Sequence, residues 1–403
     1  MRILREIASS VATGLAAALA RPRHTLLIAF GFVVAGVTLA VLLMLPAGLK
    51  RLAGNTGSPD IAVVLSGNSF NESGGVFKPE LAALVGSLPG VAHGSQGQPL
   101  VAPQFVANAR LRRIDGTTAT VLVRGVTPVF WEVIGKAASM ESGRRFAAGK
   151  DELIAGVAAT RGFVAMDTGA TLSIHDTPWH VSGEFAAGGG FWESELWTDT
   201  AALQAAYHAQ GAVTCLWVKL TSPAAFGAFK HALRDNPQTQ GLHAILQRDY
   251  YTEQTSFLKY LIVAATEGIA VALGLGAILA IVNALGMALA ARRRELAIQR
   301  AVGFRRAALA FALLIEVLVI GAVCAAVAVL VAWLAVNGHE VGSSTGGSAI
   351  EFRMHVGSAV IGWTFVYVLM LGVLSALWPI ARAVRTADQN VAGRMIIEAA
   401  HCE

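Results

Sequence analysis

The chain contains little charge. Only 14% of its 403 residues are Asp, Glu, Lys or Arg, whereas a soluble domain carries about 25%. The deficit is concentrated in four stretches, each long enough to supply the roughly 20 apolar residues that cross a bilayer. Two of these stretches contain no charged residue, and the other two contain one glutamate each, Glu267 and Glu316. The sequence therefore predicts a membrane protein with four transmembrane helices.

Cysteine is also scarce. The three cysteines are Cys215 between the first and second spans, Cys324 in the third span and Cys402 near the end of the chain. Because the membrane would separate them, we expect no internal disulfide. We expect Cys215 to be buried, with pairing between molecules as the less favoured alternative.

The basic residues predict the orientation of the spans, because cytoplasmic segments of membrane proteins are enriched in Lys and Arg. Arginines cluster before the first span, between the second and third, and after the fourth, at Arg2, Arg5, Arg21, Arg23, Arg292, Arg293, Arg294, Arg300, Arg305, Arg306, Arg382, Arg385 and Arg394. We therefore expect a bacterial inner-membrane protein with both termini in the cytoplasm and the large insert in the periplasm. The net charge of +5 follows from this topology, and no basic stripe indicates nucleic-acid binding.

These features divide the chain into nine segments. We expect an amphipathic cytoplasmic helix at 1–24, spans at 25–47, 256–291 (with a stalk at its start), 307–336 and 356–380, an outer domain at 48–255, a cytoplasmic loop at 292–306, a periplasmic loop at 337–355 and a cytoplasmic tail at 381–403. The helix at 1–24 either lies on the lipid bilayer surface or extends the first span, and the sequence leaves both open. The first span is longer than the apolar part of a signal peptide, so we expect an uncleaved anchor.

The outer domain has the pattern of an α+β fold. Strands are predicted at 60–66, 100–106, 109–114, 120–126, 152–157, 170–175, 179–183, 196–198 and 215–221, and helices at 78–88 and 222–234. Strand–helix units at both ends of the insert enclose a middle that is nearly all β. The predicted fold class is therefore a membrane α-helical protein, with four transmembrane helices, that carries an inserted two-lobed α+β periplasmic domain.

The most informative segment is the arginine-rich turn between the second and third spans. It places the apolar Leu296 and Ile298 and the acidic Glu295 among arginines. A loop that only sets topology needs neither feature. We therefore predict a short helix that offers apolar and charged groups to a cytoplasmic partner.

This turn resembles the cytoplasmic signature of the MacB/FtsX-type ABC transporter permeases. The matching residues are 294–298, 300–303, 305 and 306, with Asn283 upstream. In the outer domain, sequence runs follow the order of that family's MacB-like periplasmic core domain, and they begin at Leu122, Glu141, Glu152, Gly169 and Trp179. Together with one span before the insert and three after it, these matches extend the resemblance over nearly the whole chain.

The resemblance implies the membrane subunit of an ATP-driven transporter with no catalytic, cofactor or metal site of its own. ATP and Mg would bind to a separate cytoplasmic ABC ATPase that docks on the turn through Arg293, Arg294, Glu295, Leu296, Ile298, Arg300, Ala301 and Gly303. The permease would pair with a second copy of itself or a paralogous permease. Small and polar residues of the second span suit that contact or packing within one bundle equally, namely Gly268, Gly274, Gly276, Asn283 and Gly286.

The implied mechanism is mechanotransmission, in which ATP-driven movement of the turn is carried through the second span to the outer domain. The implied cargo is a peptide, a drug or a lipid-linked molecule exported from the periplasmic side, with a periplasmic adaptor and an outer-membrane duct. The alternative is an FtsX-like mechanotransmitter that activates a periplasmic cell-wall hydrolase without transport.

The sequence departs from the family pattern after the last span, where Gln389 and Asn390 replace a Pro-Val pair. Some members carry a fused ATPase, and this chain has no phosphate-binding loop. The nearest candidate, at 143–150, has the wrong spacing and lies in the outer domain. We therefore assign no nucleotide site to this chain.

Three further groups have a structural interpretation that we favour over a functional one. For Glu267 and Glu316 we expect interhelical hydrogen bonds or snorkelling, not a proton relay. His175 and His180 lack an evident third ligand, so we expect no metal there. We expect the aromatic residues of 191–197 to pack in the core, with an exposed partner-binding tip as the alternative.

Overall fold

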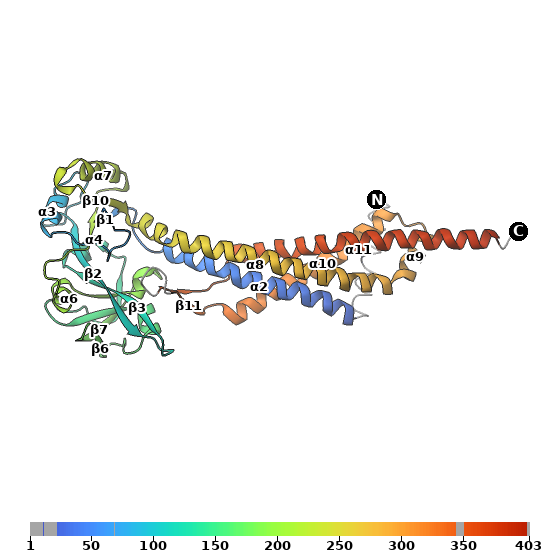
Figure 1. The fold of residues 1–403 in the computed structure, drawn as a ribbon, viewed down its shortest axis with the longest axis horizontal. Coiled ribbons are helices and arrows are strands. Elements are labelled where there is room, and N and C mark those ends of the chain that lie inside the picture. Colours follow the sequence, from blue (N-terminus) through green and yellow to red (C-terminus); the bar gives the residue numbers. More distant parts are fainter. Residues whose placement is uncertain (1–10, 12–21, 68, 344–349, 401–403) are drawn as a thin grey trace. The chain divides into compact units, whose positions relative to one another are not determined.

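The computed structural model describes residues 11, 22–67, 69–343 and 350–400, which form two compact units (Figure 1). A helical unit contains Met1–Ala47, Leu261–His339 and Met354–Glu403. A unit rich in β-strands contains Gly48–Tyr260 and Glu340–Arg353 and is called the inserted domain below. The amphipathic helix predicted at 1–24 lies almost entirely outside the described residues.

Four helices of the described chain are long and apolar enough to cross a membrane. They are α2 (Pro22–Gly54), α8 (Gln247–Ala291), α10 (Arg306–Val336) and α11 (Ser358–Ala400). A short helix, α9 (Arg293–Ala301), joins α8 to α10. Side chains from all five helices form one hydrophobic core that includes Phe32, Ile281, Leu296, Val317 and Leu371. The four predicted spans therefore coincide with these helices.

The structure differs from the predicted segment boundaries at four places. Helix α8 begins at Gln247, before the predicted start of the second-span segment at 256. Helix α2 continues through Pro46 to Gly54, beyond the predicted end of the first span. Helix α11 continues to Ala400, where a separate tail was predicted at 381–403. The predicted loop at 337–355 contains a hairpin of β11 (Glu340–Ser343) and β12 (Ile350–Arg353), and this hairpin groups with the inserted domain.

The inserted domain is built on one mixed sheet of ten strands, ordered β10-β1-β9-β2-β3-β8-β5-β7-β4, with β6 paired to β7. Its strands are β1 (Ile61–Ser66), β2 (Val101–Arg112), β3 (Thr118–Val126), β4 (Ser139–Gly143), β5 (Glu152–Gly156), β6 (Thr171–Ile174), β7 (Thr177–Ala186), β8 (Leu196–Asp199), β9 (Cys215–Lys219) and β10 (Leu242–Leu246). The β3–β8 and β5–β7 pairs are parallel, and the other pairs are antiparallel.

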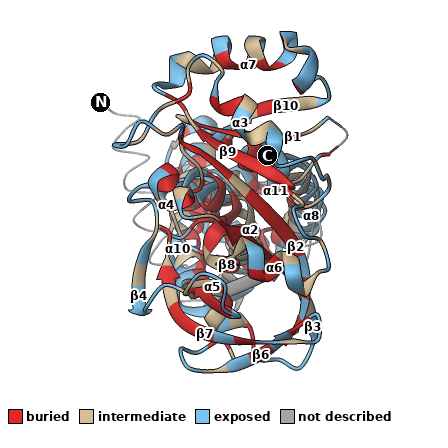
Figure 2. Cartoon of the chain, turned by 90° about the vertical axis from the view of Figure 1, so that its left-hand side faces the viewer, coloured by how far each residue is buried: buried red, intermediate tan, exposed pale blue. Residues whose placement is uncertain are grey.

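Short helices flank the strands. The α-helices are α3 (Glu80–Gly86), α4 (Val129–Ile134), α5 (Val157–Gly162), α6 (Thr200–Ala206) and α7 (Phe226–Asp235), and the 3₁₀ turns are η1 (Phe191–Ser194), η2 (Pro223–Ala225) and η3 (Pro237–Thr239). Figure 2 shows the central strands β9 and β2 as largely buried, whereas α7 and the edge strand β4 carry exposed residues.

Two hydrophobic clusters divide the sheet into two lobes. In the first, Ala62 and Val64 of β1 pack with Val85 of α3 and with Phe229 and Leu233 of α7. The second cluster gathers buried side chains of β2, β3, β5–β8, α5 and α6. The predicted two-lobed α+β fold is therefore confirmed, and both lobes share one sheet.

Strand β2 crosses both lobes as a single element, so the prediction of two strands at 100–106 and 109–114 was wrong. The pattern changes at Ala107 and Asn108, yet these residues stay in register with Val123 and Leu122 of β3. The pairing therefore continues where the alternation of apolar residues is interrupted. Five further strands and α-helices of the insert, α4, β4, α5, α6 and β10, were not predicted.

Candidate functional site

The arginine-rich turn forms helix α9, as predicted. Its start is held by Arg292, whose Nη1 lies 3.0 Å from both carboxylate oxygens of Glu316 on α10. The Nε of Arg292 also lies 3.4 Å from the carboxylate of Glu295 one turn later. Glu316 is therefore part of an interhelical ion pair, as favoured from the sequence.

One side of α9 faces the core of the helical unit and the other faces away from it. Leu296 is buried in the core formed by α8, α10 and α11. Ile298 and Val302 are 63% and 74% exposed, and Arg294 is exposed as well. Residues three or four positions apart share a helix face, so these three side chains form one surface. We call Arg294, Ile298 and Val302 the exposed α9 face.

The end of α9 is defined by a glycine. Gly303 has a φ of +105°, a backbone angle that residues with a Cβ rarely adopt. Its N–H donates to the carbonyl of Arg300 at 3.1 Å, and the Arg300 guanidinium donates to the carbonyl of Phe304. The chain thus leaves α9 through a fixed turn and enters α10 at Arg306. Of the other predicted docking residues, Arg293, Glu295 and Ala301 are exposed and Arg300 is half-buried. Leu296 was predicted to face the partner, but it packs in the core and is only 4% exposed, so it is not available to a docked protein.

The predicted packing residues of α8 fall into two groups. A Cβ at Gly274 would lie 2.9 Å from the Tyr367 hydroxyl of α11, so this glycine permits a contact within the chain. The space beside Gly268, Gly276 and Gly286 is open, and Asn283 is exposed. The structure therefore assigns Gly274 to packing within one chain.

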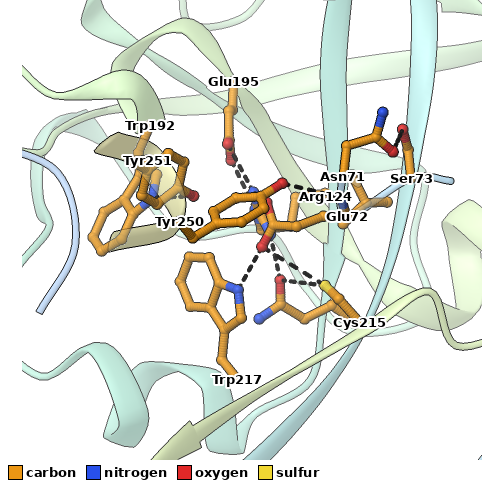
Figure 3. A network of polar contacts seen from close by, with 12 residues as sticks. Asn71, Glu72, Ser73, Arg124, Trp192, Glu195, Cys215, Trp217, Tyr250 and Tyr251 are labelled. Atoms are coloured by element: carbon orange, nitrogen blue, oxygen red, sulfur yellow. Dashed lines mark hydrogen bonds and ion pairs between the residues drawn. The ribbon is translucent and has the colours of Figure 1, made fainter. Parts of the chain in front are cut away.

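The inserted domain contains a buried charge cluster that the sequence did not predict (Figure 3). Arg124, on β3, is fully buried between two carboxylates, Glu72 from the loop after β1 and Glu195 just before β8. Its nitrogens lie 2.7–2.8 Å from Glu195, 2.8–3.2 Å from Glu72 and 2.6 Å from the Gln104 amide oxygen of β2. These five contacts use all five N–H donors of a guanidinium.

Aromatic side chains complete the cluster. The guanidinium carbon of Arg124 lies 4.6 Å from the centroid of the Trp217 ring. The indole N–H of Trp217 donates to Glu72 at 2.6 Å, and that of Trp197 donates to Glu195 at 2.8 Å. Each carboxylate thus accepts hydrogen bonds from both the Arg124 guanidinium and an indole N–H. Burial of charge is tolerated under this condition.

The electrostatics of the cluster keep Arg124 charged. Burial by itself would lower the pKa of Arg124, but the carboxylates of Glu195 and Glu72 raise it well above its usual value. Burial raises the pKa of Glu195, and Arg124 opposes part of that rise. Burial, together with the nearby Glu72, also raises the pKa of the Cys215 thiol, so the thiol stays protonated and unreactive. The expectation that Cys215 is buried is confirmed.

Two tyrosines near the start of α8 join this cluster. The hydroxyl of Tyr250 accepts a hydrogen bond from the backbone N–H of Glu72 at 3.1 Å. The hydroxyl of Tyr251 accepts one from the indole of Trp192 at 2.9 Å. Phe191 stacks on Tyr251 with 5.4 Å between ring centroids. The first turns of α8 are therefore attached to the sheet by hydrogen bonds and ring contacts.

The two residues after α2, Asn55 and Thr56, are attached to the same region. The hydroxyl of Thr56 accepts a hydrogen bond from the backbone N–H of Phe191 at 2.7 Å, and the Asn55 side chain donates to the carbonyl of Gly188 at 2.9 Å. The segment 188–192 thus contacts both the end of α2 and the start of α8. Trp192 and Trp197 are buried, which confirms the expectation that these aromatics pack in the core.

One feature of the sequence points to the buried charge cluster. Arg124 stands within an apolar strand run, Val121–Val126 of β3, where a charged side chain needs a buried partner. The partners are distant in sequence, so the signal could identify Arg124 but not Glu72 or Glu195. Among the described residues, no group of three or more His, Cys, Asp and Glu could hold a metal ion. His175 instead stacks on Tyr207 with 4.6 Å between ring centroids.

Two family models match the chain. The MacB-like periplasmic core domain matches residues 25–236, which is more than half of the chain, and the FtsX-like permease C-terminal domain matches residues 268–387. The chain belongs to the MacB/FtsX-type ABC transporter permeases. This membership makes it a membrane protein with a periplasmic domain and implies an ABC ATPase as partner. Neither matching domain is an ATPase domain.

The solved structures that match this chain include the following three domains of other proteins. The periplasmic region of MacB from Actinobacillus actinomycetemcomitans is 14% identical, with a TM-score of 0.36, and the match covers 49% of this chain and 93% of that one. The extracellular domain of the noncanonic ABC-type transporter YknZ from Gram-positive bacteria is 17% identical, with a TM-score of 0.34 and coverage of 46% and 99%. A domain of a putative permease from Porphyromonas gingivalis is 16% identical, with a TM-score of 0.31 and coverage of 46% and 88%. No curated protein matches the chain.

Proposed function

We propose that this permease works by mechanotransmission, with a cytoplasmic ABC ATPase docked on the exposed α9 face. The observation that carries the proposal is the division of α9 into a buried and an exposed side. Leu296 and the Arg292–Glu316 ion pair fix α9 to the helical unit, so a force on its exposed side would move α8 and α10 with it. Arg294, Ile298 and Val302 supply the charged and apolar groups that a partner would contact.

The inserted domain would receive this movement. Helix α8 runs without a break from Gln247 to Ala291, and its first turns are attached to the buried charge cluster through Tyr250 and Tyr251. A displacement of α8 along its axis would therefore act on the sheet itself and not on a loose linker. These contacts support α8 as the element that transmits force.

The arginine distribution supports an inner-membrane location with both termini and α9 in the cytoplasm. In this setting the permease would act as a homodimer or with a paralogous permease. It would export a peptide, a drug or a lipid-linked molecule from the periplasmic side, together with a periplasmic adaptor and an outer-membrane duct. ATP and Mg would bind only in the ATPase.

The decisive experiment isolates the tagged chain with its ATPase and measures both the amount of bound ATPase and the ATP hydrolysis in lipid nanodiscs. Replacing Arg294 and Ile298 by alanine should weaken ATPase binding by about 30-fold, which corresponds to the loss of about 2 kcal/mol expected for a central interface contact. The matched control is Arg234→Ala on α7, where the side chain is 71% exposed in the inserted domain. Unchanged ATPase binding in the α9 variants would contradict the proposal.

A further inference from the structure

The tip of the β2–β3 hairpin carries an unusual combination of exposed side chains. Arg110 and Arg112 are exposed at the end of β2, where they lie opposite Thr120 and Thr118 of β3. Ile114, in the turn that follows, is 65% exposed. Two arginines and a large apolar side chain therefore face solvent within five residues.

A second segment lies along this tip and adds to the surface. The N–H of Ile114 donates to the carbonyl of Gly162 at 3.1 Å, and the N–H of Val164 donates to the carbonyl of Arg112 at 3.0 Å. The side chain of Val164 is 50% exposed. These backbone hydrogen bonds hold Ile114 and Val164 beside each other. We call residues 110–118 and 161–164 the hairpin tip.

The hairpin tip is basic in a domain that is otherwise slightly acidic. The hairpin tip contains four arginines, Arg110, Arg112, Arg113 and Arg161, against one aspartate, Asp115, which pairs with Arg113. Residues 50–255 as a whole contain 16 basic and 17 acidic residues. Arginine beside exposed aliphatic side chains is the composition of surfaces that bind anionic lipid, because the guanidinium pairs with phosphate and the aliphatic group enters the interface.

We propose that the hairpin tip binds the anionic phospholipid headgroups of the bilayer that holds the permease. Arg110 and Arg112 contact lipid phosphates, and Ile114 and Val164 enter the headgroup boundary. A lipid surface fits this tip better than an acidic protein does. A stable protein interface buries about 800 Å² on each partner, whereas this surface is one turn and one adjoining segment. The inserted domain is also tethered to a bilayer through α2 and α8, which keeps lipid at a high effective concentration.

The test uses the full chain in nanodiscs of phosphatidylcholine alone or with phosphatidylglycerol. A fluorophore is attached at Thr118→Cys in a Cys402→Ser background, because Cys215 and Cys324 are buried. A lipid with a nitroxide on its headgroup then quenches the fluorophore only at close approach. We expect strong quenching in discs with phosphatidylglycerol and weak quenching in phosphatidylcholine.

Two variants and a matched control make the test specific. Each arginine contributes about fivefold to binding an anionic surface, so Arg110→Gln with Arg112→Gln should weaken lipid contact by about 25-fold. Ile114→Ser should reduce quenching in both lipids. Lys230→Gln with Arg234→Gln, on α7, removes the same charge from the same domain and should change nothing. Three results would overturn the proposal: equal quenching in the two lipids, no quenching in either lipid, or no effect of the arginine variants. If the tip binds an acidic protein instead of lipid, one of these results is expected.

Discussion

Tyr250 accepts a hydrogen bond from the backbone N–H of Glu72, with 3.1 Å between the hydroxyl oxygen and the nitrogen. Glu72 is also one of the two carboxylates that pair with Arg124 of β3. Tyr250 of α8 is therefore hydrogen-bonded directly to a residue of the buried charge cluster.

Replacement of Tyr250 by phenylalanine should destabilise the inserted domain by about 1–3 kcal/mol. The change leaves the Glu72 N–H without its acceptor in a buried position, and Gln254 loses its contact with the same hydroxyl. Denaturant unfolding of the full chain in detergent, followed by tryptophan fluorescence, measures the loss. Tyr260→Phe is the control, because Tyr260 is 71% exposed. Equal stability of the two variants would show that the Tyr250 hydroxyl contributes nothing.

Replacement of Arg124 by methionine should be more severe. It leaves Glu72 and Glu195 buried without their cation, and breaking a buried ion pair in this way costs about 3–5 kcal/mol. Adding Glu72→Gln and Glu195→Gln to the same chain should recover part of the loss, because the remaining groups are then neutral. The same unfolding assay tests both. A loss below about 1 kcal/mol in the single variant would mean that the cluster relaxes or admits water.

A salt bridge at the edge of the inserted domain should produce a pH-dependent stability. The Arg144 guanidinium holds the Glu152 carboxylate at 2.7 and 2.8 Å, and hydrogen bonding by Arg144 lowers the pKa of Glu152 from 4.5 to about 2. Because the pKa of Glu152 is lower in the folded state than in the unfolded state, its ionised carboxylate stabilises the fold above pH 4.5. This stabilisation is lost as the pH falls toward 2 and the carboxylate is protonated in both states. Arg144→Gln should therefore be less stable than the parent at pH 7, and the difference should shrink between pH 4.5 and 2. A difference that stays constant over this range would contradict the assignment.

The ion pair at the start of α9 should be recoverable by exchange of its charges. Arg292→Glu places two carboxylates side by side and should reduce ATPase stimulation, because α9 loses its attachment to α10. Glu316→Arg alone should do the same. The chain that carries both exchanges restores an attractive pair and should regain activity in the nanodisc ATPase assay. If the double exchange is no better than either single one, the pair does not position α9.

Two neighbouring glycines of α8 offer a comparison between packing within the chain and contact with a second copy. Gly274→Val should destabilise the helical unit, because the added side chain meets the Tyr367 hydroxyl, which itself donates to the carbonyl of Ala270 at 2.7 Å. Gly276→Val should be tolerated within one chain, because no atom lies within 4 Å of its added Cβ. Thermal unfolding measures the first effect. Crosslinking in nanodiscs shows whether Gly276→Val reduces dimer formation instead.

The sequence predicted the parts of this structure that depend on local composition. Long apolar runs predicted the four spans, and the arginine pattern with Leu296 inside it predicted α9. The buried charge cluster depends on contacts between Glu72, Arg124 and Glu195, which lie 52 and 71 residues apart in sequence. No local pattern records such contacts. The continuation of β2 through Asn108 was missed for the same reason, since it depends on pairing with β3.

The order of strands in the sheet also constrains how the protein is made. Strand β1 begins shortly after α2, whereas its partners β9 and β10 come about 150 residues later, at the other end of the insert. The strands between them, from β2 to β8, pair largely with one another. During translocation the second lobe can therefore form while the backbone hydrogen-bonding groups of β1 are still unpaired. The first lobe can close only after β10, which directly precedes α8 in the chain, has been translocated. The β11–β12 hairpin, which also belongs to the inserted domain, follows later still, after α10, so this domain is completed only when three of the four spans have been made.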